Sequence, residues 1–143
     1  MDKTIRIKAM CIFLHEGKML VAQGLEKKTD KPFYRVLGGS LNPFEKSIDA
    51  VRREIQEELH TDIKNIELLE VIENIFEFEG EKGDEIVFLY KADLVNEALY
   101  TQETIRIVEE AYELDAKWVP VEDILGGDVP LYPGMEYEKY LNV

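Results

Sequence analysis

The sequence has little cysteine and no long apolar run. Its 143 residues contain one cysteine, Cys11, which excludes an internal disulfide and lies in an apolar run where we expect it to be buried. No apolar run approaches the roughly 20 residues that a membrane-spanning helix needs. The first residues show no signal-peptide pattern. We therefore expect a cytoplasmic protein that does not contact membranes.

Basic residues are also scarce. The chain has 17 Lys and Arg against 30 Asp and Glu, which gives a formal net charge of −13. Such a negative surface disfavours nucleic acid, whose binding depends on neutralising phosphates with Lys and Arg. If the substrate is itself a polyanion such as a diphosphate, a divalent cation held by clustered carboxylates would invert the local field.

The organisation of the chain is simple, with no repeat, low-complexity segment or linker-like stretch. Residues 1–143 are therefore expected to form one domain, and mixed strand and helix patterns indicate an α/β layered fold. One expected strand is stopped by Gly38 and Gly39. The expected strands span 4–14, 19–23, 33–37, 66–79, 86–94, 105–108 and 117–119. The expected helices span 46–59 and 135–141, with a short helical turn after Pro120.

The helix expected over 46–59 has two distinct faces. One is an apolar stripe at helical spacing, formed by Ile48, Val51, Ile55 and Leu59. On the other, Glu54, Glu57 and Glu58 stand at i, i+3 and i+4, which places three carboxylates on one patch. Because they repel one another, they favour a hard divalent cation such as Mg²⁺ or Mn²⁺. A solvated acidic face is the alternative interpretation.

The residues before and within this helix strengthen the interpretation of a metal site. Gly38 and Gly39 follow a strand, where glycine lets the backbone approach a ligand and offer it a carbonyl oxygen. Glu45 stands at the junction of loop and helix, where it is placed to pair with Arg53.

Together these residues resemble the Nudix box. Gly39, five residues, Glu45, seven residues and then the segment 53–59 match every specified position of its first 21. The box continues with a glycine and an aliphatic residue, where this chain has His60 and Thr61. Because neither position holds a ligand, we expect only a slightly different helix exit, with His60 as a solvated cap residue rather than a metal ligand.

The resemblance implies the Nudix fold, a mixed β-sheet between helices. It also implies a metal-dependent hydrolase that cuts a diphosphate linkage in a small nucleotide-like substrate. The implied ligands of Mg²⁺ or Mn²⁺ are the carbonyl oxygen of Gly39 and the carboxylates of Glu54, Glu57 and Glu58. Arg53 and Glu45 would form an ion pair that orients the site, and Glu54 is the first choice of general base.

Further site residues are expected with open alternatives. Arg35 is expected either to bind substrate phosphate or to form a surface salt bridge. A downstream acid could join the site or be a surface charge; the candidates are Glu85, Glu103, Glu109 and Glu113. Four aromatic residues are expected to stack on a base or to pack in the core, namely Phe33, Tyr34, Phe76 and Phe78.

The substrate and the assembly are constrained only by the resemblance. The motifs of the coenzyme A, ADP-ribose and diadenosine polyphosphate groups are missing, which leaves nucleoside triphosphates, oxidised ones included, and other nucleoside diphosphate derivatives. A homodimer is one expectation, since dimers are frequent in the family.

A nucleotide-binding sensor without catalysis is a rival interpretation, although every acid of the box is present. A structural domain with a chance acidic helix is a second rival.

Overall fold

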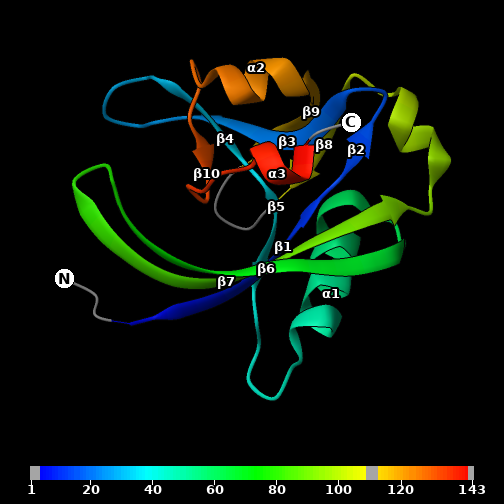
Figure 1. Cartoon of the computed structure of the whole chain (residues 1–143), viewed down its shortest axis with the longest axis horizontal. Helices are drawn as coiled ribbons and strands as arrows, with labels where there is room; N and C mark the ends of the chain where they lie inside the picture. The colour runs from blue at the N-terminus through cyan, green and yellow to red at the C-terminus, as the bar shows by residue number, and fades with distance from the viewer. Residues whose placement is uncertain (1–3, 109–112, 142–143) are drawn as a thin grey trace.

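Two β-sheets with helices on both sides make up the computed structural model, which describes residues 4–108 and 113–141 (Figure 1). The first sheet has the strand order β5-β1-β7-β6, with bounds β1 (Arg6–Ile12), β5 (Leu37–Ser40), β6 (Ile63–Phe78) and β7 (Glu81–Leu94). The second has the order β10-β4-β3-β9-β8, with bounds β3 (Lys18–Leu25), β4 (Pro32–Arg35), β8 (Thr104–Val108), β9 (Glu113–Pro120) and β10 (Leu131–Tyr132). The short β2 (Leu14–His15) pairs with β3. The helices are α1 (Ser47–Leu59), the 3₁₀ helix η1 (Glu97–Thr101), α2 (Val121–Gly126) and α3 (Glu138–Leu141).

The predicted α/β layered fold is confirmed, but the single mixed sheet is corrected to two sheets. Both contain one parallel pair, β1 with β7 and β10 with β4, among antiparallel pairs. The chain passes from the first sheet to the second at Phe13, whose carbonyl oxygen accepts from the Leu20 amide at 3.1 Å. The strand expected over 4–14 is therefore two strands, because β1 pairs in one sheet and β2 in the other.

The apolar core lies in two clusters on opposite faces of the strands. Ala9, Cys11 and Phe13 contribute to the cluster beneath α1, whereas Met10 and Ile12 contribute to the cluster beneath α2 and α3. Figure 1 shows α1 on one side of the strands and the orange α2 and red α3 on the other. This alternation follows from the two-residue period of a strand buried on both faces. Cys11 is fully buried as expected, and its burial raises the pKa of the thiol.

The expected helix is confirmed within one residue as α1, but its buried face differs from the predicted stripe. Ile48 is exposed, and Ala50 is buried in its place with Val51, Ile55 and Leu59. Glu58 is buried as well, at 3% exposure. It follows Val51 by two helical turns and Ile55 by one, so it belongs to the face that packs on the strands.

His60 ends α1 in the left-handed conformation, with φ 55° and ψ 43°, and its amide donates to the Gln56 carbonyl oxygen. This is the conformation for which the box glycine is suited, and a residue with a Cβ adopts it at a cost. We expect His60→Gly to raise the free energy of unfolding by about 1 kcal/mol, or the melting temperature by roughly 2–4 °C. Thermal denaturation followed by circular dichroism measures this. His60→Ala keeps the strain, so an equal gain in that variant would contradict the explanation.

The strand expected over 33–37 is divided between the two sheets, and the two glycines expected to stop it lie within its second part. After β4, the chain forms β5, in which Gly38 and Gly39 pair with Met10 and Ala9 of β1. Gly38 has a φ of +139°, and a Cβ there would overlap the carbonyl oxygen of Ala9. The glycines therefore allow a close strand pairing rather than ending it.

The remaining elements differ from expectation mainly at their ends. β6 begins at Ile63 and β7 at Glu81, so the turn between them consists of Glu79 and Gly80 alone. The expected strands over 105–108 and 117–119 lie in β8 and β9, and the helical turn after Pro120 is α2. The helix expected over 135–141 is reduced to α3. In the part of the chain described, no helix is long and apolar enough to cross a membrane.

Candidate active site

Arg53 lies at the centre of the acidic face of α1. Its Nε donates to Glu45 Oε2 at 2.9 Å, and its Nη1 donates to Glu54 Oε1 at 2.9 Å and to Glu57 Oε1 at 3.3 Å. Its Nη2 donates to the carbonyl oxygen of Ser40 at 2.9 Å and to Glu45 Oε1 at 3.0 Å. One guanidinium thus links the loop before the helix, the helix itself and β5, a geometry to which its fixed donors are suited.

The acidic network holds Glu45 strongly ionised. Its carboxylate accepts from Arg53 and from the Asn42 amide, and these hydrogen bonds lower the pKa of Glu45 from 4.5 to about 2. The same contact with Glu45 raises the pKa of Arg53. The Glu45–Arg53 pair therefore stays charged throughout the neutral and mildly acidic range.

This shift predicts a pH-dependent contribution of Glu45 to stability. Because the folded-state pKa is lowered, the contribution is fully present above pH 4.5 and is lost as the pH falls toward 2. Glu45→Gln keeps an acceptor for Arg53 but removes the ionisation. We expect the wild-type protein to melt above this variant at pH 6 and the difference to disappear near pH 2. A difference in melting temperature that stays constant from pH 6 to pH 2 would contradict the lowered pKa of Glu45.

Glu58 has different surroundings from Glu54 and Glu57. Its Oε1 accepts from the Gly38 amide at 2.9 Å, and its Oε2 lies 3.4 Å from Nη2 of Arg35. Arg35 also donates through Nη1 to the carbonyl oxygen of Gly38 at 3.3 Å. This ion pair is not a surface contact, since the two side chains are 18% and 3% exposed. Glu58 and Arg35 therefore attach the end of α1 to the glycine segment.

The donor atoms around Gly39 suit a hard divalent cation. A Cβ on Gly39 would overlap the Glu54 carboxylate, so only glycine allows this carboxylate to lie against the backbone of β5. Carboxylate and carbonyl oxygens are the ligands that Mg²⁺ and Mn²⁺ prefer. Within residues 4–108 and 113–141, however, no three acidic, His or Cys side chains are arranged as a ready metal cage. Arg53 contacts Glu54 and Glu57 instead, and the metal ligands remain predictions.

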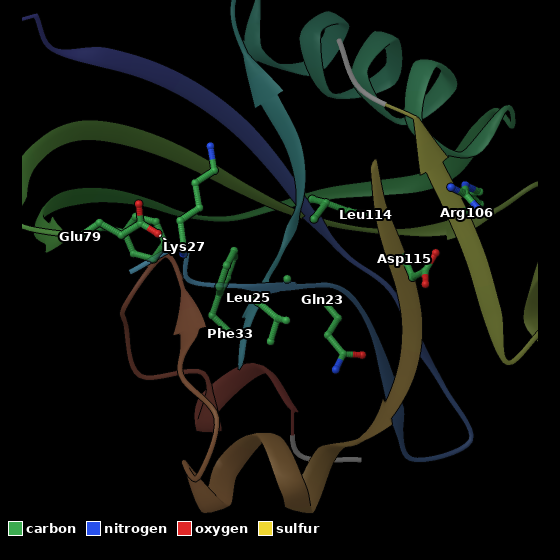
Figure 2. Close-up of a pocket in the computed structure, with 10 residues that line it drawn as sticks. Gln23, Leu25, Lys27, Phe33, Glu79, Arg106, Leu114 and Asp115 are labelled. Carbon is green, nitrogen blue, oxygen red and sulfur yellow. Dashed lines mark hydrogen bonds between the residues drawn. The ribbon is translucent and has the colours of Figure 1, made fainter. Parts of the chain in front are cut away.

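A cavity of about 590 Å³ lies between the two sheets. Figure 2 shows Lys27 and Glu79 at one end of it, Phe33 near the middle, and Arg106 and Asp115 at the other end. The amide of Lys27 donates to Glu79 Oε1, which links the β3–β4 loop to the turn between β6 and β7. The remaining lining residues are Gln23, Gly24, Leu25, Phe78 and Leu114.

A second cavity of about 200 Å³ adjoins the first, because Phe33, Phe78 and Leu114 line both. Arg35 lines this second cavity and contacts Glu58, so the cavity opens next to the end of α1. Its other lining residues are Lys8, Met10, Asn74, Phe76, Glu85, Tyr132 and Pro133.

The aromatic residues expected from the sequence divide into two groups. Phe33, Phe76 and Phe78 are half-buried and line the second cavity together with Tyr132. Phe33 and Phe78 are in edge contact at 5.4 Å between ring centres, and Phe78 and Tyr132 at 5.5 Å. Tyr34 instead packs against the core cluster beneath α2 and α3. Three of the four are therefore placed both to pack on one another and to contact a ligand.

The four downstream acids are placed differently. Glu85 lies in β7 and lines the second cavity. Glu103 is exposed and lines a separate cavity beside His15 and Trp118. Glu113 is the first residue of β9. Glu109 lies outside the described residues.

Lys8, Asn74 and Tyr132 line the second cavity but were not expected there from the sequence. Asn74 stands between Ile72 and Phe76 on one face of β6, so its neighbours on that face are apolar. A lone amide at an inward position of a strand is the signal that could have indicated Asn74.

Comparisons with known proteins agree with this fold. The NUDIX domain model matches residues 4–137. A NUDIX hydrolase from Nitrosomonas europaea superposes with a TM-score of 0.64 at 16% identity, covering 86% of this chain and 77% of its own. The Mutator MutT protein from Bacillus halodurans gives 0.63 at 21% identity, covering 95% and 78%. A MutT NUDIX hydrolase from Burkholderia pseudomallei gives 0.59 at 20%, covering 97% and 96%.

At these identities the structural likeness establishes the fold alone, and no curated protein matches the chain. The family model covers nearly all of the chain. The matched range includes the acidic helix, the glycines of β5 and the residues that line the first and the second cavity. The chain therefore belongs to the Nudix hydrolase family.

Proposed function

We propose that this protein hydrolyses a diphosphate linkage in a nucleoside triphosphate or another nucleoside diphosphate derivative, with Mg²⁺ or Mn²⁺. The observation that supports this most directly is the position of the Glu54 and Glu57 carboxylates around Arg53, beside Gly39. Glu54, Glu57 and Glu58 would hold the cation together with the carbonyl oxygen of Gly39. When bound, a divalent cation would neutralise diphosphate oxygens and lower the pKa of a water molecule.

The protein's own residues have separate roles in this proposal. Glu54 would accept the proton of the attacking water at its carboxylate, the general-base role. Arg53 would orient Glu54, since it donates to Glu54 at 2.9 Å while Glu45 fixes its Nε. Arg35, which adjoins both Glu58 and the second cavity, would bind a substrate phosphate.

The cavities support a nucleotide rather than an inorganic diphosphate. A cavity of 590 Å³ is within the usual range for small-molecule sites, and half-buried aromatic rings line its junction with the second one. Aromatic rings suit the stacking of a nucleobase. One similar structure is described as an ADP compounds hydrolase and two as MutT proteins, so both ADP derivatives and triphosphates belong among the substrates to test.

The test is a release assay with the full chain. Nucleoside triphosphates, nucleotide sugars and ADP-ribose are incubated with Mg²⁺ or Mn²⁺, and products are separated by anion-exchange chromatography. We expect a nucleoside monophosphate from at least one substrate and none when EDTA is in excess. Binding of a nucleotide without any hydrolysis would instead support the sensor. Absence of both binding and hydrolysis would support a structural domain, as would a melting temperature that neither Mg²⁺ nor EDTA changes.

A further inference from the structure

A buried polar network lies in the second cavity, apart from the acidic helix. Lys8 of β1, Asn74 of β6 and Glu85 of β7 all line this cavity. Lys8 Nζ lies 2.8 Å from Glu85 Oε2, and Asn74 Nδ2 donates to Glu85 Oε1 at 3.3 Å. Three adjacent strands thus supply an ammonium group, a carboxylate and an amide to one place in the sheet.

Burial makes this network unusual for a purely structural feature. Asn74 and Glu85 are only 6% and 7% exposed, and the Lys8 side chain is 23% exposed. Removing polar groups from water is costly, and a buried ion pair commonly gives no net gain in stability over apolar residues of similar volume. Polar side chains that line a cavity together with aromatic residues therefore indicate recognition of a ligand.

The network leaves one acceptor and several donors available. An ionised glutamate can only accept, so Asn74 must present its amide nitrogen to Glu85, which fixes the orientation of the amide. Among the described residues this is the only side-chain hydrogen bond of Asn74, and its carbonyl oxygen keeps its capacity to accept. Lys8 has three N–H groups. Among the described residues, its ammonium group contacts only Glu85.

The shape of the cavity indicates what kind of group it would take. Its volume of about 200 Å³ is below the range for a complete small-molecule ligand, so it suits one moiety of a larger substrate. The aromatic residues Phe76, Phe78 and Tyr132 line it, which suits a planar ring. Arg35 connects it to Glu58 and so to the proposed diphosphate site.

We propose that Lys8 and Asn74 determine the base specificity of the enzyme by binding the lactam edge of a nucleobase, as in hypoxanthine, guanine, uracil or thymine. The lactam oxygen would accept from Lys8 Nζ, and the adjacent ring N–H would donate to Asn74 Oδ1. Adenine and cytosine offer a ring nitrogen and an amine at this edge. Because a carbonyl oxygen carries more negative charge than a ring nitrogen, the Lys8 ammonium favours the lactam. This inference rests on the proposed function, since it names the base of that same substrate.

The test compares inosine and adenosine triphosphates, which differ only at this edge. We expect kcat/KM for ITP to exceed that for ATP by about tenfold or more in the wild-type protein, the effect of one charge-assisted hydrogen bond. We expect the ratio of kcat/KM for ITP to that for ATP to fall close to one in two variants, Asn74→Ala and the double substitution Lys8→Met with Glu85→Gln. The double substitution avoids leaving a buried charge without a partner. The ratio is independent of the fraction of protein that is folded.

The control is Glu73→Gln, which removes a charge from the exposed face of the same strand and should keep the wild-type ratio. A wild-type ratio near one, or a ratio that both cavity variants preserve, would overturn the proposal. If neither triphosphate is hydrolysed, the nucleotide sugars and ADP-ribose of the release assay decide the proposed function, and calorimetric titration with IMP and AMP decides the inference. The inference is supported if the wild-type protein binds IMP more tightly than AMP and Asn74→Ala abolishes this difference. Equal binding of IMP and AMP, or binding of neither, overturns the inference.

Discussion

Glu57→Gln is expected to lower kcat/KM of the hydrolysis by about 1,000-fold, because it removes one proposed cation ligand and its charge. The glutamine has nearly the same shape, and the Glu57 side chain is 59% exposed. Folding should therefore be almost unaffected. Steady-state kinetics with Mg²⁺ measure the first effect, and thermal denaturation measures the second.

The matched control for this variant is Asp49→Asn, which removes an exposed acidic charge from the first turn of the same helix. It lies outside the Arg53 network and should keep wild-type turnover. A second measurement separates metal binding from catalysis: titration with Mn²⁺ by calorimetry should show weaker binding to Glu57→Gln than to the control. Unchanged turnover and unchanged Mn²⁺ affinity in Glu57→Gln would refute its assignment as a ligand.

The two adjacent glycines of β5 are expected to respond differently to alanine. At Gly39 the added Cβ would meet the end of the Glu54 side chain, with Oε1 at 2.7 Å, and this side chain can move aside. Displacing a proposed catalytic carboxylate by about 1 Å costs on the order of 100-fold in rate. We therefore expect Gly39→Ala to lose about 100-fold in kcat/KM while its melting temperature changes little.

Gly38→Ala should instead lose stability. Its Cβ would overlap the carbonyl oxygen of Ala9, and the φ of +139° is one that an alanine rarely adopts. Because neither β1 nor β5 can move aside without an energetic cost, we expect a loss of about 3 kcal/mol in the free energy of unfolding. Chemical denaturation measures it.

Gly134→Ala is the control for both glycine variants, because a Cβ at Gly134 would meet nothing within 4 Å. It should leave activity and stability unchanged. Full activity in Gly39→Ala would show that the position of the Glu54 carboxylate against β5 does not matter for catalysis. An unchanged denaturation midpoint in Gly38→Ala would show that β1 and β5 separate more easily than their pairing indicates.

Local patterns in the sequence determined the helix that carries the candidate site. The 3.6-residue period places α1 within one residue, and the ion pair expected between Glu45 and Arg53 is present. The contacts of Arg53 with Glu54 and Glu57 were not expected. Helical geometry depends on neighbours within four residues, so one sequence is enough to predict it. The exit of the helix was not predicted in this way: a slightly different exit was expected, whereas His60 adopts the left-handed conformation for which the box glycine is suited.

Only the tertiary structure decided which of the three glutamates is buried and which residues line the second cavity. Glu58 is removed from water because β5 and Arg35 pack against it, a contact that helical spacing does not contain. The second cavity brings together Lys8, Phe33 and Asn74, which lie far apart along the chain. Their meeting depends on the pairing of β1 with β7 and on the passage of the chain between sheets at Phe13. Long-range pairing of this kind is set by the packing of the whole core, because local propensity specifies a strand without specifying its partner.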